Sequence, residues 1–140
     1  ALFANVTAAV VTDPEEVRKF VDETGVDALA VSVGNTHLMT CPETVLDLAR
    51  LRAIGDAAPI LPLVLHGGSG LSQDLRRQLA RDTTVCKVNI GTELRMAFGA
   101  ALRQALATDP EVFDRLQILG QTIDPVTRAA RRAIAGLTGA

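Results

Sequence analysis

Short runs of β-branched residues alternate with amphipathic stretches along this chain, and that alternation constrains the possible fold most strongly. The rhythm is typical of βα units around a parallel sheet, because parallel strands need a crossover, usually a helix, between them. The sequence therefore predicts an α/β protein. The expected strands are Asp27 to Gly34, Pro62 to Leu65 and Thr84 to Ile90.

Capping residues mark the expected helices. Asp13 can cap a helix that has Pro14 at its first position and stops at Gly25. The helix that starts at Ser72 should place Leu75 and Leu79 on one face. The other expected helices run from Glu43 to Ile54 behind Pro42 and closed by Gly55, from Glu93 to Ala107 with Thr92 as cap, and from Asp124 to Ala135 after a polar stretch between Pro110 and Gly120.

The composition limits the kinds of partner. A chain of 140 residues, 48% hydrophobic and 21% charged, has the size and balance of one globular domain. A net charge of −2 provides no overall positive potential that would attract nucleic acid. With only 3% aromatic residues, binding by base stacking is nearly excluded as well. No apolar run reaches the ~18 residues that span a bilayer. Cys41 and Cys86 indicate free thiols, so we expect a cytoplasmic protein that binds neither nucleic acid nor membrane.

Both histidines follow an expected parallel strand at its carboxyl end, the edge where α/β proteins carry their active sites. His37 and His66 could therefore bind one metal ion through their imidazole nitrogens. Catalytic zinc usually takes three protein ligands, so this pair is one ligand short. The alternative is that each histidine is only a hydrogen-bonded polar residue at a strand end.

Two glycine-containing turns follow the second and third expected strands and suit an anion. Gly67, Gly68, Ser69 and Gly70 expose backbone N–H groups just before a helix, where a phosphate is favoured. The segment Asn89 to Thr92 (Asn89, Ile90, Gly91 and Thr92) repeats this arrangement. Adjacent anion-binding turns after the last strands form the usual phosphate site of a β/α barrel. The alternatives are a tight turn without ligand and an ordinary helix cap.

Three further features have weaker implications. Lys87 shares strand parity with Asn89, so it could point inward and form a Schiff base, although a snorkelling or paired lysine is the commoner case. Cys86 has the opposite parity and should face the outer helices as a small hydrophobe. The arginines of the last expected helix should form a solvated face or an oligomer contact; they are Arg128, Arg131 and Arg132.

From Val11 to the C-terminus the sequence resembles the class II, metal-dependent ketose-bisphosphate aldolases, which include the fructose-bisphosphate and tagatose-bisphosphate enzymes. The resemblance is carried by Leu65–Gly70 (LHGGSG) and Lys87–Leu94 (KVNIGTEL), strings that together are highly specific, and by Thr24–Val31. It implies a TIM (β/α)8 barrel, of which residues 1–140 supply about the last three βα units and a C-terminal helix as the C-terminal part of a single domain.

The resemblance also implies a chemistry from carbohydrate metabolism, as in glycolysis. A divalent metal, commonly zinc, polarises the carbonyl of dihydroxyacetone phosphate and stabilises the enediolate, with a monovalent cation as a further candidate cofactor. His37 and His66 match two metal ligands. Gly67–Ser69 and Asn89–Thr92 match the phosphate-binding segments, and the Asn89 side chain would touch the enediolate.

The chain departs from the family pattern in two ways. Leu38 follows His37 where the family has glycine, and the segment with the third histidine ligand and the proton-shuttling aspartate has no counterpart. We therefore expect a fragment, one part of a split enzyme, or a piece ordered by another copy. Its expected partners are a phosphorylated sugar and either a homo-oligomer or a complementary N-terminal half-barrel. The alternative functions are a non-catalytic half-barrel that binds a sugar phosphate or a partner, and a Schiff-base aldolase that uses Lys87.

Overall fold

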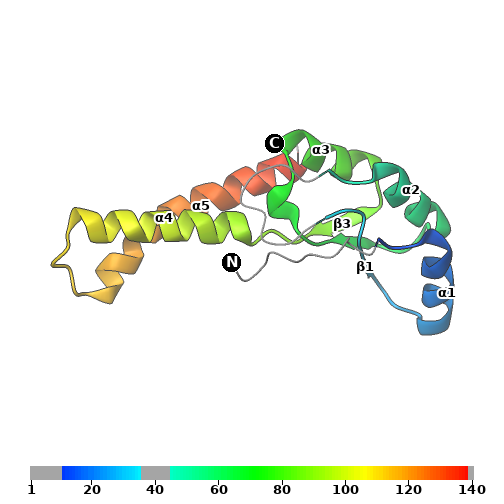
Figure 1. Ribbon diagram of the computed structural model, residues 1–140, viewed down its shortest axis with the longest axis horizontal. Coiled ribbons are helices and arrows are strands. Elements are labelled where there is room, and N and C mark those ends of the chain that lie inside the picture. Colours follow the sequence, from blue (N-terminus) through cyan, green and yellow to red (C-terminus); the bar gives the residue numbers. More distant parts are fainter. Residues whose placement is uncertain (1–10, 36–44, 139–140) are drawn as a thin grey trace.

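The computed structural model describes residues 11–35 and 45–138, in which a small parallel sheet has helices packed on one face and a long helix pair extending away from it (Figure 1). The strands are short and the last two helices are long. In chain order the elements are α1 (Pro14–Thr24), β1 (Leu29–Val31), α2 (Leu48–Ala57), β2 (Leu63–Leu65), a 3-10 turn (Gly68–Gly70), α3 (Gln73–Asp82), β3 (Val85–Val88), α4 (Thr92–Thr108) and α5 (Arg115–Thr138).

The sheet has three parallel strands in the order β1, β2, β3, which confirms the predicted α/β class. Each strand occupies part of its predicted range. Between β2 and β3 the register is irregular: Leu63 lies opposite Val85, whereas Val64 lies opposite Lys87. Cys86 is therefore an extra residue in β3, as in a β-bulge.

The core lies on one face of the sheet, beneath α1, α2 and α3. Leu63 and Leu65 of β2 are fully buried there and pack in one cluster with Val31, Leu51 and Leu79. The opposite face carries the aligned residues Ala30, Val64 and Lys87, of which only Val64 is partly buried. Parallel sheets are normally covered on both faces. Within the described residues, this sheet is covered on only one of them.

The irregularity in β3 determines the places of Lys87 and Cys86. Lys87 lies on the face away from the core, as its parity with Asn89 predicted. The prediction for Cys86 is wrong, because its side chain is exposed rather than packed under the helices. As the additional residue it leaves the alternation of the strand, and its thiol lies 3.5 Å from the carbonyl oxygen of Leu63.

The predicted ends of α1 and the predicted start of α3 are confirmed, because local capping controls both. The Asp13 carboxylate accepts a hydrogen bond from the Glu15 N–H at 2.9 Å, and Gly25 ends α1 with a φ of 63°. The Ser72 hydroxyl accepts one from the Leu75 N–H at 3.2 Å. In these two helices the sequence signal and the observed boundary coincide.

The predicted range for α2 is wrong at both ends. The helix begins at Leu48, because Asp47 caps it by accepting a hydrogen bond from the Arg50 N–H at 2.9 Å. That bond is also the main reason why the pKa of Asp47 lies below its ordinary value. The helix continues through Gly55, where a β-carbon would come within 3.1 Å of the Thr84 hydroxyl. Gly55 therefore permits close packing and does not end the helix.

The C-terminal region also differs from its prediction. The last helix begins at Arg115, so Gly120, Asp124 and Pro125 all lie inside it. α4 and α5 pack against each other and extend together away from the sheet (Figure 1). Small buried residues such as Ala105 and Ala129 allow this close packing. The arginines for which a solvated face or an oligomer contact was predicted are all exposed, namely Arg128, Arg131 and Arg132.

The helices also bear on membrane insertion. Among the described residues, no helix combines the length and the apolar character that crossing a bilayer requires.

We expect the buried cluster to dominate the stability of the described fold. Leu51 is 1% exposed, so Leu51→Ala should lower the free energy of unfolding by about 2–5 kcal/mol through lost burial and a residual cavity. The measurement is urea unfolding of the intact gene product. Ile60→Ala is the control: Ile60 is 95% exposed, and the expected change is about 0.5 kcal/mol or less. Equal effects of the two substitutions would contradict this core.

Candidate functional site

The turns that follow β2 and β3 lie side by side at the carboxyl edge of the sheet and are hydrogen-bonded to each other. The Asn89 N–H donates to the carbonyl oxygen of Leu65 at 2.8 Å, which extends the strand pairing beyond β3. The Gly68 N–H donates to the carbonyl oxygen of Asn89 at 3.0 Å. Both predicted anion-binding segments are thus brought together by the backbone of a single residue, Asn89.

His66 lies at the centre of this edge and is partly buried. The Asn89 side-chain nitrogen lies 3.4 Å from Nδ1 and 3.3 Å from Nε2 of the imidazole. The main chain of His66 is held from the other side, where the Asn35 amide donates to its carbonyl oxygen at 3.1 Å. The histidine is therefore positioned by residues that follow both neighbouring strands.

Asn35 is a site residue that the sequence analysis missed. Its side-chain oxygen accepts a hydrogen bond from the Val33 N–H at 2.8 Å while its nitrogen reaches His66, so it joins the ends of β1 and β2. The available signal was its place, directly after an apolar run that ends in a glycine. Asparagine often bonds the nearby backbone in such turns.

The second predicted metal ligand, His37, lies outside the described residues. Its convergence with His66 therefore remains a prediction. Within residues 11–35 and 45–138, no group of three or more histidine, cysteine, aspartate or glutamate side chains could hold a metal ion. The donor chemistry of His66 nevertheless fits one ligand position, because an imidazole at a strand end is a common ligand for zinc.

Gly67 and Gly68 serve different structural purposes in the first turn. Gly67 has a φ of 72°, a conformation that glycine adopts without the steric penalty of a β-carbon. At Gly68 a β-carbon would lie 2.9 Å from Ile90 Cγ1 and 3.1 Å from the Asn89 carbonyl oxygen. Gly68 thus lets the two turns touch. Because its N–H already donates to the Asn89 carbonyl oxygen, the predicted phosphate contacts would be made by the other groups of these turns.

The prediction that Thr92 caps α4 is wrong. Gly91 is the capping residue and makes no side-chain capping bond, while Thr92 is already helical. A hydroxyl from the neighbouring turn replaces the local cap, because Ser69 Oγ accepts a hydrogen bond from the Glu93 N–H at 3.2 Å. The helix end is therefore satisfied from across the site.

A buried arginine lies beneath the two turns. Arg76 of α3 is 2% exposed, and its Nη2 donates to the Gly68 carbonyl oxygen at 3.0 Å and to Glu93 Oε2 at 2.6 Å. The sequence analysis missed it. Its spacing of three residues from Leu79 was the available signal, since that spacing places a charged residue on the buried face of the helix.

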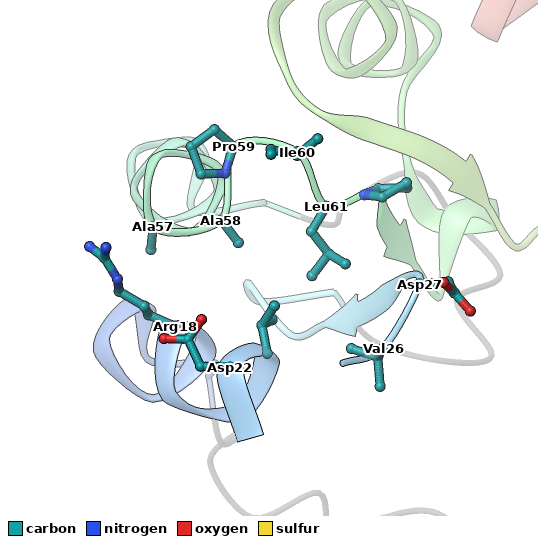
Figure 2. A pocket seen from close by; sticks show the side chains of 11 residues that line it. Arg18, Asp22, Val26, Asp27, Ala57, Ala58, Pro59, Ile60 and Leu61 are labelled. Carbon is teal, nitrogen blue, oxygen red and sulfur yellow. The ribbon is translucent and has the colours of Figure 1, made fainter. Parts of the chain in front are cut away.

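A separate hollow of about 410 Å³ lies at the opposite, amino-terminal edge of the sheet (Figure 2). Its walls come from the end of α1 and from the segment that joins α2 to β2, including Asp22, Ala57, Pro59 and Leu61. Ligands of α/β sheets bind at the carboxyl ends of the strands. The edge that carries His66 is therefore the candidate site.

Comparison with known proteins places the chain in a family. The family model described as fructose-bisphosphate aldolase class-II matches residues 3–140. The chain belongs to the class-II fructose-bisphosphate aldolase family. This finding confirms the resemblance carried by the strings after β2 and around β3.

Solved structures share the fold over most of this chain. The chain is similar to the YdjI aldolase from Escherichia coli K12, with 30% identity, a TM-score of 0.71 and coverage of 91% of this chain and 44% of that one. A putative fructose-1,6-biphosphate aldolase from Coccidioides immitis gives 24% identity, a TM-score of 0.74 and coverage of 93% and 44%. For fructose-bisphosphate aldolase from Campylobacter jejuni the values are 22%, 0.63, 91% and 45%. The chain thus spans less than half the length of these structures.

The close contact at Gly68 leads to a prediction about the site. Gly68→Ala should force the turns apart, because its β-carbon would overlap Ile90 and Val88, and the free energy of unfolding should fall by about 1–3 kcal/mol. Gly120→Ala is the matched control. An added β-carbon there would meet nothing within 4 Å, so the free energy of unfolding should rise by about 0.4–1 kcal/mol. Chemical unfolding of both variants measures the difference. If Gly68→Ala were as stable as Gly120→Ala, the packing of the turns would be refuted.

Proposed function

We propose that this chain carries the metal-binding and phosphate-binding segments of a class II aldolase. The reaction is the reversible cleavage of a ketose phosphate or bisphosphate through the enediolate of dihydroxyacetone phosphate. The observation that carries the proposal is the junction at Asn89, whose backbone joins both turns and whose amide lies against His66. Family membership supports the aldolase class, as does the resemblance to an Escherichia coli aldolase at 30% identity.

In this proposal His66 and His37 hold a divalent metal ion, with zinc as the first choice. The metal supplies Lewis-acid polarisation of the substrate carbonyl when it is bound. His66 suits this task because the Asn35 bond to its carbonyl oxygen fixes the main chain from which the imidazole extends. The third ligand and the proton-transferring carboxylate come from barrel segments that residues 11–35 and 45–138 do not include.

Asn89 is the proposed catalytic residue of this chain. Both its N–H and its carbonyl oxygen are fixed by backbone hydrogen bonds, so the main chain from which its side-chain amide extends is held in place before a substrate arrives. Such a preorganised donor stabilises a developing oxyanion without reorganisation. The amide would donate a hydrogen bond to the enediolate oxygen next to His66.

The substrate phosphate is proposed to bind between the two turns. The candidate groups are those of Gly67, Ser69, Ile90, Gly91 and Thr92, together with the Asn89 side chain. The start of α4 adds the positive end of a 17-residue helix dipole, which favours an anion. The same helix end is tied to the first turn by Ser69, so one phosphate could contact both segments.

The uncovered sheet face supports the proposal that further barrel strands complete the protein. Ala30, Val64 and Lys87 line this face. Among the described residues β1 and β3 each pair with β2 alone, which leaves on each an outer edge that a neighbouring strand would satisfy. We infer a complementary N-terminal half-barrel as the partner, from the same polypeptide or another. A homo-oligomer of the complete unit follows as the second expectation.

Metal removal tests the function directly. The intact gene product should lose aldol cleavage when treated with EDTA and regain it with zinc, because the polarising cation is removed and restored. His66→Ala should lower both the bound zinc, measured by elemental analysis, and the activity. Full activity after complete chelation would rule out the metal-dependent reaction. Phosphate binding without turnover at any metal concentration would favour the non-catalytic half-barrel instead.

Asn89→Ala tests the oxyanion role. Removing one preorganised donor should lower kcat by about 10²–10³-fold while bound zinc stays at the level of the unsubstituted protein. Steady-state kinetics and elemental analysis measure the two quantities. Gln117→Ala, an exposed amide on α5 away from the sheet, is the control and should leave kcat unchanged. An Asn89→Ala enzyme with normal kcat would remove Asn89 from the mechanism.

A further inference from the structure

Arg76 is a buried charged residue that bonds both the Gly67–Gly70 turn and the start of α4. Its Nη2 donates to the Gly68 carbonyl oxygen in the Gly67–Gly70 turn and to the Glu93 carboxylate at the start of α4. The Arg76 side chain is 3% exposed and that of Glu93 is 25% exposed. The guanidinium is therefore enclosed where it bridges the Gly67–Gly70 turn and the start of α4.

The hydrogen bonding of Arg76 is incomplete, which argues against a purely stabilising role. Within the described part of the chain, its Nε and Nη1 atoms are buried and have no hydrogen-bond partner. Unfilled buried donors lower stability, and replacing a buried ion pair with apolar residues is often neutral or stabilising. A methionine of similar length would fill the same space without those donors. The retained positive charge therefore points to a role beyond packing.

The position of Glu93 indicates what that use is. Its carboxylate lies at the N-terminal end of α4, where the peptide N–H groups would otherwise favour a phosphate. The backbone N–H of the same residue donates to Ser69 Oγ in the first turn. An unneutralised carboxylate here would repel a phosphate dianion, and Arg76 at 2.6 Å compensates it.

We propose that Arg76 is a positioning residue for phosphate recognition. It fixes the spacing between the Gly67–Gly70 turn and the start of α4. It also compensates the negative charge of Glu93, so the two turns can bind a sugar phosphate without electrostatic repulsion from that carboxylate. Arg76 does not contact the phosphate. The inference rests on the proposed function, because it assumes that the two turns bind a phosphate.

The test measures the affinity of the intact gene product for inorganic phosphate by titration calorimetry. Arg76→Met should weaken binding by about tenfold, because the Glu93 carboxylate is then uncompensated beside the phosphate. Adding Glu93→Gln to Arg76→Met should recover about threefold, because the repelling charge is then absent. Arg77→Met is the matched control: Arg77 is the next residue on α3, pairs with Asp74 on the surface, and should bind phosphate like the unsubstituted protein.

Kinetics separate positioning from general damage to the fold. Arg76→Met should raise the KM for the phosphorylated ketose more than it lowers kcat, since the lost interaction concerns the phosphate rather than the reacting carbon. Arg76→Lys keeps the charge but not the planar fork, so its affinity should fall between those of the unsubstituted protein and Arg76→Met. Arg76→Lys also provides the test if thermal unfolding shows that Arg76→Met does not fold.

Three outcomes overturn the inference, and they are distinguishable. If Arg76→Met binds phosphate within about twofold of the unsubstituted protein, the scatter of a surface substitution, Arg76 has no positioning role. If the double variant binds no more tightly than Arg76→Met, the charge compensation is wrong. If the unsubstituted protein does not bind phosphate, the proposed phosphate site fails first and the role of Arg76 fails with it.

Discussion

The pair of backbone hydrogen bonds at Asn89 is the interaction on which the site depends. One bond continues the β2–β3 ladder beyond the last strand residue, and the other attaches the glycine turn to that continuation. Because both bonds are local to the carboxyl edge, the imidazole of His66 and the amide of Asn89 come together without any long loop. The absence of a β-carbon at Gly68 is what permits this spacing.

The sheet is packed on one face only in the part of the chain that the structure describes. One face is packed beneath α1, α2 and α3 with fully buried leucines, whereas the face carrying Val64 and Lys87 is open within the described residues. Parallel strands in enzymes are covered on both faces. The coverage of less than half of the related structures is consistent with this one-sided core.

Helix boundaries could be predicted from the sequence where a cap lies next to its helix, and not where tertiary contacts compete. Asp13 and Ser72 satisfy nearby N–H groups, so their helices begin where predicted. At α4 the satisfying hydroxyl comes from Ser69, 24 residues away, which no local pattern reveals. α5 extends through Gly120 and Pro125 because its packing against α4 outweighs two residues that usually interrupt helices.

The sequence alone determined the α/β class, the edge of the sheet on which the candidate site lies, and the family. These follow from the order of apolar runs, helix caps and glycine turns, which is a property of neighbouring residues. Only the tertiary structure decided that Arg76 lies buried beneath both turns, that Gly68 is a packing contact, and that Asn35 holds His66. These facts depend on atoms that meet only after the strands pair, and their distances are not encoded in any local spacing.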